Sequence, residues 1–185
     1  ARTADELDPV LAAWVEPVNN FVLAGARGTI AYRTGGKVPI RAAVNRWLPV
    51  PGWSTDHDWS GYIPDDELPR SRNPDVGAIV TANQRVTTAE YPHELGPRPD
   101  GPSRAGRTWA RPGETGPCAP ETMEKIHADA VSTLGRRVAE LSAPLLREWD
   151  GRMDAGSVNA AIYPTAMHAL AATLAARLPE PLLTN

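Results

Sequence analysis

The pattern of apolar and polar positions divides the chain into a first half of short β-prone runs and a second half of helical stripes. At the start, Thr3 and Glu6 have the spacing of a helix capping box, and apolar residues follow at helical spacing as far as Trp14. This pattern predicts a short amphipathic helix that ends before Pro17.

Three β-prone runs follow in the first half. The runs 20–24 and 29–33 are separated by Gly25-Ala-Arg-Gly28, which predicts a hairpin. A third run, Val76-Gly-Ala-Ile-Val80, is bounded by turn residues and leads into Thr81-Ala-Asn83-Gln-Arg85. Apolar runs of this kind are typical of buried strands, so we expect a strand to end next to Asn83.

The second half carries helical patterns. Apolar residues recur every three or four positions over 121–141, which predicts one amphipathic helix. A short helix is expected at 144–149, and an Ala-rich helix is expected at 157–178. The fold class is therefore α+β. The expected organisation is a β-rich part at 1–95, a Pro/Arg/Gly-rich loop at 96–118 and a helical segment at 119–185.

Composition narrows the possible functions. The chain has 185 residues with a formal net charge of −3, so nothing in its charge favours nucleic acid or an anionic membrane as a partner. Its 19 prolines and 15 glycines concentrate between Lys37 and Pro120. Trp53 and Trp59 in that region argue against disorder because such side chains have large areas to bury. Cys118 is the single cysteine, which excludes an intrachain disulfide.

Few residues suggest chemistry by themselves. No phosphate loop, paired metal spacing or Ser-His-Asp arrangement can be proposed from the sequence. His57, between two aspartates, could bind a metal or lie in a solvated loop. Asn83 could donate its amide N–H to a developing oxyanion, or it could be a strand-end Asn with its bonds satisfied. Arg104 is a further candidate as the partner of an anion.

A set of spaced Gly, Pro, Trp and Asn positions also occurs in one order in a known family. The positions are Pro17-Val-Asn-Asn20, Ala24-x-x-x-Gly28-x-Ile-Ala-Tyr32, Gly35/Gly36, Pro39, Leu48-Pro-Val-Pro51-Gly52, Asp58-Trp59-x-Gly61, Ile63-Pro64, Asn73-Pro74, Gly77, Ile79-Val-Thr-Ala-Asn83, Met123-Glu-Lys-Ile-His-Ala-Asp129 and Leu146-x-x-Trp149-Asp-Gly151-x-Met153. In these positions the chain resembles the β-subunit of penicillin acylases. It also resembles their relatives that act on cephalosporins, acyl-homoserine lactones and lipopeptides.

This resemblance implies an N-terminal-nucleophile hydrolase with an αββα sandwich, of which 1–95 would be a part. In such enzymes a precursor cleaves itself and exposes a Ser, whose hydroxyl attacks an amide while its own α-amino group acts as the base. Catalysis then requires no cofactor. Such enzymes are usually exported, so a periplasmic or secreted location is favoured.

The resemblance also implies roles for individual residues. Asn83 matches the Asn whose side-chain NH₂ stabilises the oxyanion. Arg104 matches an Arg that orients this Asn and the nucleophile, with Arg107 as the fallback. Glu94 is the nearest candidate for a carboxylate that binds the family's structural calcium.

The chain departs from the family at its start. It begins with Ala1 rather than a nucleophilic Ser, and 82 residues precede Asn83, far fewer than in the family. We therefore expect an internal segment of the β-subunit that is inactive alone. Its partners would be the remaining α- and β-subunit segments and a small acylated amide substrate. The alternative is a non-catalytic remnant or a standalone α+β binding module with the same scaffold.

Overall fold

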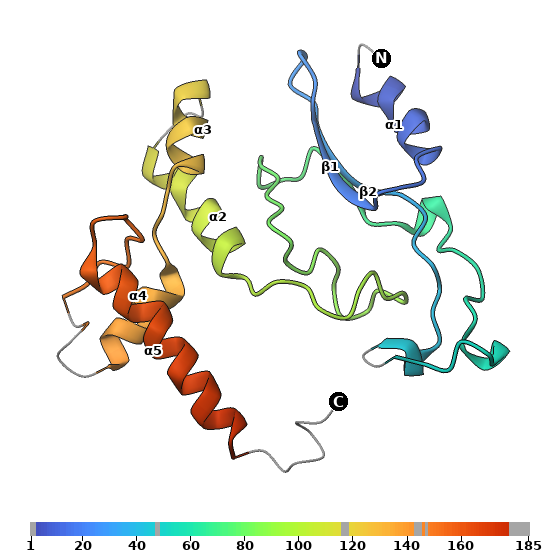
Figure 1. Cartoon of the computed structure of the whole chain (residues 1–185). Helices are drawn as coiled ribbons and strands as arrows, with labels where there is room; N and C mark the ends of the chain where they lie inside the picture. Colours follow the sequence, from blue (N-terminus) through green and yellow to red (C-terminus); the bar gives the residue numbers. More distant parts are fainter. Residues whose placement is uncertain (1–2, 47–48, 116–118, 143–145, 147, 178–185) are drawn as a thin grey trace. The chain divides into compact units, whose positions relative to one another are not determined.

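The computed structural model describes residues 3–46, 49–115, 119–142, 146 and 148–177. It divides into two units, Ala1–Gly101 and Pro102–Asn185 (Figure 1). The described part of the first unit holds the β-sheet with one α-helix, and that of the second unit holds four α-helices. The α+β class predicted from the sequence is confirmed. Cys118 lies outside the described residues.

The predicted capping box opens the first helix, α1 (Ala4–Ala12). The Thr3 hydroxyl accepts a hydrogen bond from the Glu6 N–H at 3.2 Å, which confirms the role read from the sequence. After the helix, the Trp14 indole donates to the Pro17 carbonyl at 2.8 Å and packs edge-on against Phe21. These contacts fix the segment between α1 and the first strand of the sheet.

The sheet of the first unit has three antiparallel strands in the order β1–β2–β3. The strands are β1 (Asn19–Ala24), β2 (Ile30–Gly35) and β3 (Arg70–Arg72). The predicted hairpin is confirmed, because Val22 pairs with Tyr32 across the β1–β2 turn. Gly28 lies in that turn with a φ of 83°, a value that glycine adopts at little cost. β2 is the central strand and pairs with β3 on its other side.

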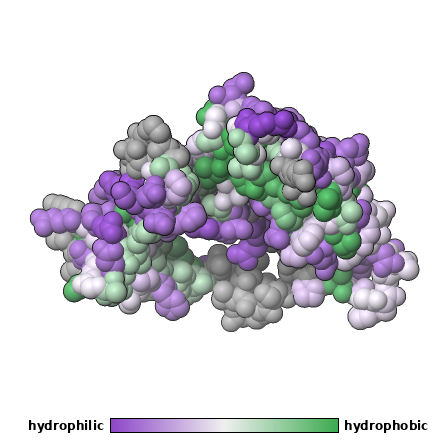
Figure 2. Space-filling model, turned by 90° about the horizontal axis from the view of Figure 1, so that it is seen from above, coloured by the Kyte–Doolittle hydropathy of each residue, from purple (hydrophilic) through white to green (hydrophobic). Residues whose placement is uncertain are grey.

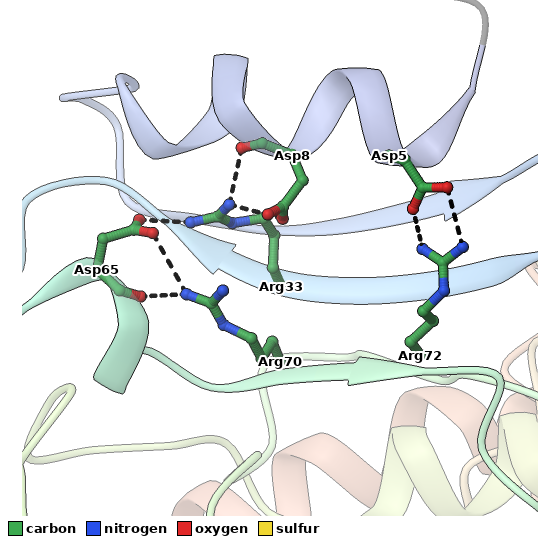
Figure 3. Close-up of polar contacts among 6 residues, drawn as sticks. All are labelled: Asp5, Asp8, Arg33, Asp65, Arg70 and Arg72. Carbon is green, nitrogen blue, oxygen red and sulfur yellow. Dashed lines mark hydrogen bonds and ion pairs between the residues drawn. The ribbon is translucent and has the colours of Figure 1, made fainter.

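A buried arginine on β2 joins the sheet to the elements around it (Figure 3). Arg33 has 2% of its side chain exposed and donates to the backbone carbonyl and the carboxylate of Asp8 on α1, at 2.9 and 2.7 Å. It also pairs with Asp65, which in turn binds Arg70 of β3. At the other end of β3, Arg72 pairs with Asp5 of α1. The charged groups thus hold α1 against the face of the sheet (Figure 3).

The long Pro/Gly/Trp segment between β2 and β3 is ordered around a small apolar cluster. Val38, Ile63 and Leu68 are buried together, and Ile40 and Leu95 pack against them. Other large apolar side chains of this unit stay at the surface, where Trp53 is 90% exposed. Figure 2 shows hydrophobic and hydrophilic residues side by side on one face of the molecule.

The second unit consists of helices around its own core. They are α2 (Ser103–Thr115), α3 (Pro120–His127), α4 (Thr133–Leu141) and α5 (Val158–Ala175). Its buried cluster is Ala139, Leu146, Trp149 and Ala160, with Ile162 and Tyr163 packed against it. α5 confirms the predicted C-terminal helix, and Ser157 caps its start by accepting from the Ala160 N–H at 3.2 Å.

Two predicted features of the second half need correction. The single helix expected over 121–141 is two helices, because Asp129 accepts from the Val131 N–H at 2.9 Å and Ser132 begins a new helix by capping Gly135. The loop expected at 96–118 contains α2. Helical spacing places Arg107 and Arg111 on one face of α2, and both reach Asp129, which stabilises a helix that composition disfavours.

The strand expected at Val76–Thr81 is also absent. This segment has no regular secondary structure, although its residues from Ala78 to Thr81 are half-buried. An apolar run becomes a strand only when a neighbour hydrogen-bonds to it, and no described strand of the chain does so. The helix expected at 144–149 lies largely outside the described residues. No helix in the described ranges has the length and apolar character to cross a membrane.

Candidate functional site

A hollow of about 960 Å³ lies in the first unit and is lined by several separate stretches of sequence. One side comes from the hairpin through Asn20 and Thr34, and another comes from residues 40–45. The remaining side comes from residues 83–87 and 91–99, which include Asn83 and Glu94. Its size suits a small organic ligand.

The predicted catalytic Asn83 lies in this hollow on an unusual backbone turn. Its φ is 62°, in the left-handed region that Asn tolerates better than most residues. Its carbonyl accepts from the Asp100 N–H at 2.7 Å. Asn83 is exposed and is one of the residues that line the hollow. The structure thus places Asn83 where a bound molecule could reach it.

The next residue folds its side chain back over the same turn. Gln84 accepts from the Ala82 N–H at 2.6 Å and donates to the Val80 carbonyl at 3.0 Å. The backbone of Gln84 also forms an isolated parallel β-bridge with Asp100, the residue whose N–H donates to the Asn83 carbonyl. Bonds therefore hold the backbone on both sides of Asn83.

A polar cluster from the hairpin reaches the hollow beside these loops. The Tyr32 hydroxyl donates to the Asn20 side-chain oxygen at 2.8 Å and lies 2.8 Å from the Thr34 hydroxyl. Asn20 and Thr34 line the hollow, and Thr34 is 3% exposed. Burial raises the pKa of Tyr32, which keeps its hydroxyl protonated at neutral pH. The cluster supplies fixed, uncharged polar groups.

The loop that follows Asn83 is tied to the sheet side of the unit. The Tyr91 hydroxyl donates to the Glu67 carbonyl at 3.0 Å, and His93 pairs with the Glu67 carboxylate. The rings of Tyr91 and His93 meet edge-on with their centres 5.6 Å apart. This anchoring places Glu94 on the lining of the hollow.

Glu94 is the residue predicted to bind calcium. In the described ranges, no three acidic, His or Cys side chains gather closely enough to hold a metal ion. Calcium normally takes about six to eight oxygen ligands, several of them carboxylates. The role of Glu94 as a calcium ligand stays a prediction.

The two predicted arginines lie in the second unit, on α2. The backbone carbonyl of Arg104 accepts from the Thr108 hydroxyl at 3.0 Å. Arg107 is an ion-pair partner of Asp129 at 2.7 Å, so it holds α2 to the turn after α3. This contact gives the fallback candidate Arg107 a structural role. The part played by Arg104 stays a prediction.

Sequence reasoning did not single out Asn20, Thr34 or Gln84. One signal was available, because alternation along β2 places Tyr32 and Thr34 on one face. The fold-back of Gln84 carries no sequence signal, since it depends on the left-handed turn at Asn83.

A family model described as penicillin amidase matches residues 1–184. The chain is 36% identical to the penicillin acylase 2 proenzyme of Pseudomonas sp. (strain SE83) over 191 residues, which cover 96% of this chain and 25% of that protein. It is 28% identical to the acyl-homoserine lactone acylase QuiP of Pseudomonas putida, covering 88% of this chain and 22% of that protein.

A likeness in fold accompanies these matches. The thermostable penicillin G acylase from Alcaligenes faecalis in orthorhombic form matches with a TM-score of 0.60 and 17% identity. The match covers 82% of this chain and 30% of that one. The chain thus spans about a quarter of the length of the proteins to which it is similar.

Proposed function

Because the chain belongs to the penicillin amidase family, we propose that it is a segment of an amidohydrolase that cleaves a linear amide through an acyl-enzyme. In this proposal the segment supplies Asn83 as the oxyanion donor. The nucleophile comes from a part of the parent enzyme outside this chain.

The chemistry requires a donor at a defined place. When a hydroxyl attacks an amide carbonyl, negative charge develops on the carbonyl oxygen, and a fixed N–H group lowers the barrier by binding it. The attacking hydroxyl would belong to an N-terminal Ser, and its α-amino group, with a reference pKa near ~8, would take the proton at neutral pH. A second attack by water would then release the acyl group.

The placement of Asn83 is the observation that carries the proposal. Asn83 lines a hollow of about 960 Å³, and its backbone is fixed by Asp100 and by the Gln84 fold-back. A donor of this kind need not reorganise when charge develops. The neighbouring Asn20 and Thr34 add uncharged polar groups with which a substrate amide could bond.

Two further residues complete the proposal. Arg104 would orient Asn83 and the nucleophilic amine, as the family resemblance implies. Glu94 would contribute one carboxylate to a structural calcium site, with the other ligands coming from outside the described side chains. Neither residue is itself the oxyanion donor in this proposal.

The segment would work only with the rest of its parent. Relatives named as a penicillin acylase proenzyme and as acyl-homoserine lactone acylases suggest a small acylated amide as the substrate. The remaining segments would bring the nucleophile and the acyl pocket. The isolated chain is therefore expected to hydrolyse neither penicillin nor a p-nitrophenyl amide.

The test removes the amide of Asn83 without straining its turn. In the full-length parent enzyme, Asn83→Gly keeps the left-handed backbone accessible, and Asn83→Asp keeps the shape but loses the donor. Both should lower kcat by about 10²–10³. Asn159→Ala, on α5 and outside the lining of the hollow, is the control and should leave kcat unchanged.

Unchanged turnover in Asn83→Gly would reject the oxyanion role. Hydrolysis by the isolated chain would reject the need for an external nucleophile. If the parent reading frame contains no self-cleavage site that exposes a Ser, Cys or Thr upstream of this segment, the alternative of a non-catalytic remnant or binding module is favoured.

A further inference from the structure

The side chain of Gln84 closes the turn that presents Asn83. Its carbonyl oxygen lies 2.6 Å from the Ala82 backbone nitrogen, and its amide nitrogen lies 3.0 Å from the Val80 carbonyl oxygen. Both groups of the side-chain amide are thus engaged within the four preceding residues. The side chain is half-buried, which strengthens these bonds relative to bonds in water.

The backbone at Asn83 needs such support. The preceding residues 76–82 belong to no strand or helix, so no ladder of hydrogen bonds holds them. A residue other than Gly in the left-handed region is less stable than in its usual conformations, and it persists only when its surroundings fix it. Gln84 holds the chain before Asn83, and Asp100 holds the Asn83 carbonyl at 2.7 Å.

We propose that Gln84 is a positioning residue for the reaction: it fixes the left-handed turn at Asn83 and thereby aims the Asn83 amide into the hollow. This inference rests on the proposed oxyanion role of Asn83. Gln84 also borders the hollow, but both groups of its side-chain amide are used by Ala82 and Val80, so the proposal gives it a role through Asn83.

The size of the effect follows from the demands of catalysis. An oxyanion donor works only within about 0.5 Å and 10–20° of its productive geometry. A shift of ~1 Å in a catalytic group can lower the rate about 10²-fold. Removing the Gln84 fold-back should therefore lower kcat by about 10- to 100-fold, with KM nearly unchanged, because the loss falls on the transition state.

The experiment uses the full-length parent enzyme and an acylated amide substrate. Gln84→Met keeps the length of the side chain and removes both bonds. Gln84→Glu can still accept from the Ala82 N–H, but, when ionised, it cannot donate to the Val80 carbonyl. We expect Met to show the full loss of kcat and Glu to restore part of it. Glu148→Met, an exposed residue of the second unit, controls for the introduced side chain.

A double variant separates positioning from general destabilisation. If Gln84 acts through Asn83, adding Gln84→Met to Asn83→Gly should lower kcat no further. An additive loss, an unchanged kcat in Gln84→Met, or parallel losses in the Tm and kcat of that variant would each overturn the proposal.

A crystal structure of the Gln84→Met enzyme separates failure of this inference from failure of the proposed function. A displaced Asn83 amide supports the positioning role, and an Asn83 that keeps its place and its left-handed φ overturns it. Unchanged turnover in Asn83→Gly would instead reject the oxyanion role, whatever that crystal structure shows.

Discussion

At the scale of single residues, Arg33 joins several elements of the first unit through its guanidinium. It is almost fully buried on the central strand, and its guanidinium binds Asp8 of α1 and Asp65 of the turn before β3. Its Nε atom is buried without a hydrogen-bond partner. A buried cation persists only when carboxylates neutralise it, so the three side chains depend on one another.

Replacing Arg33 should therefore lower the free energy of unfolding more than replacing an exposed residue of the ion pairs between α1 and the sheet. Arg33→Met leaves Asp8 without its cation and Asp65 with Arg70 alone, and should lower the free energy of unfolding by about 2–4 kcal/mol, since both carboxylates are partly solvated. Asp5→Asn breaks the pair with Arg72, both half-exposed or more, and should cost roughly 0–1 kcal/mol. Urea denaturation measures both, and equal losses would contradict the account.

At the scale of elements, the packing of α4 depends on a missing side chain. A Cβ atom on Gly135 would lie 2.9 Å from two ring atoms of Trp149, a core residue of the second unit. Gly106 on α2 is exposed, and a Cβ atom there would meet nothing within 4 Å. The two glycines thus differ in the space around them and not in their helical backbone conformation.

The same substitution should consequently have opposite effects in the two helices. Gly106→Ala should stabilise the chain by about 0.5–1 kcal/mol because Ala loses less backbone entropy in a helix. Gly135→Ala should destabilise it by about 1–3 kcal/mol because the ring of Trp149 must move. Thermal denaturation followed by circular dichroism decides, and a raised Tm in Gly135→Ala would show that the core has room.

The contact between α2 and the turn after α3 should depend on pH. Burial alone raises the pKa of Asp129, but the Val131 N–H, Arg107 and Arg111 outweigh it and hold this pKa below its ordinary value. A lowered pKa stabilises the fold at pH values above that of the unfolded carboxyl, about 3.9, and the gain is lost as pH falls through the folded pKa.

We therefore expect the second unit to lose stability steeply below about pH 4. Asp129→Asn should be less stable at pH 7 by about 2 kcal/mol, and its loss of stability in acid should be shallower. Asp154→Asn, which breaks a half-exposed pair with Arg152, should keep the steep loss. Denaturation curves from pH 3 to 7 check this prediction. The same dependence of stability on pH in the unsubstituted chain, Asp129→Asn and Asp154→Asn would contradict it.

Elements that carry local signals were predictable from the sequence. The capping box at Thr3, the hairpin around Gly28 and the C-terminal helix after Ser157 each depend on residues close in the chain. The strand at Val76–Thr81 was wrong because a strand needs a partner that periodicity cannot supply. The helix α2 was missed because the segment 96–118 has the composition of a loop. The residue that stabilises the helix, Asp129, lies further along the chain.

The candidate site was predictable in part, and through the family resemblance rather than through pattern. The structure places Asn83 and Glu94 on one hollow, but their roles stay predictions. Asn20 and Thr34 reach the same hollow only because the hairpin folds. The position of the Gln84 side chain depends on the left-handed backbone at Asn83, which residue propensities do not predict.

At the scale of the whole chain, the division into two units is the dominant feature. Ala1–Gly101 holds the sheet and its apolar cluster, and Pro102–Asn185 holds the helices and a separate core. A unit with its own core can fold by itself. The chain spans 25% of the length of the penicillin acylase 2 proenzyme to which it is similar.

Separate production of the two units tests this division. Residues 1–101 should show the far-ultraviolet signal of a mostly irregular fold with a small sheet and one helix, and 102–185 that of helices. The sum of the two spectra should match the spectrum of the whole chain. Each should unfold cooperatively in urea. A fragment that is unfolded alone but folds when mixed with the other would contradict the independence of the two cores.

The register of the sheet also orders events in time. Tyr32 pairs with Val22 across a tight turn, and with Ser71 only after the long segment that contains Trp53 has closed. Closing a longer loop costs more entropy and delays the contacts that depend on it. We therefore expect the hairpin to be the early event and the docking of β3 the late one. A newly made chain would then hold Arg33 unneutralised by Asp65 until the first unit is nearly complete.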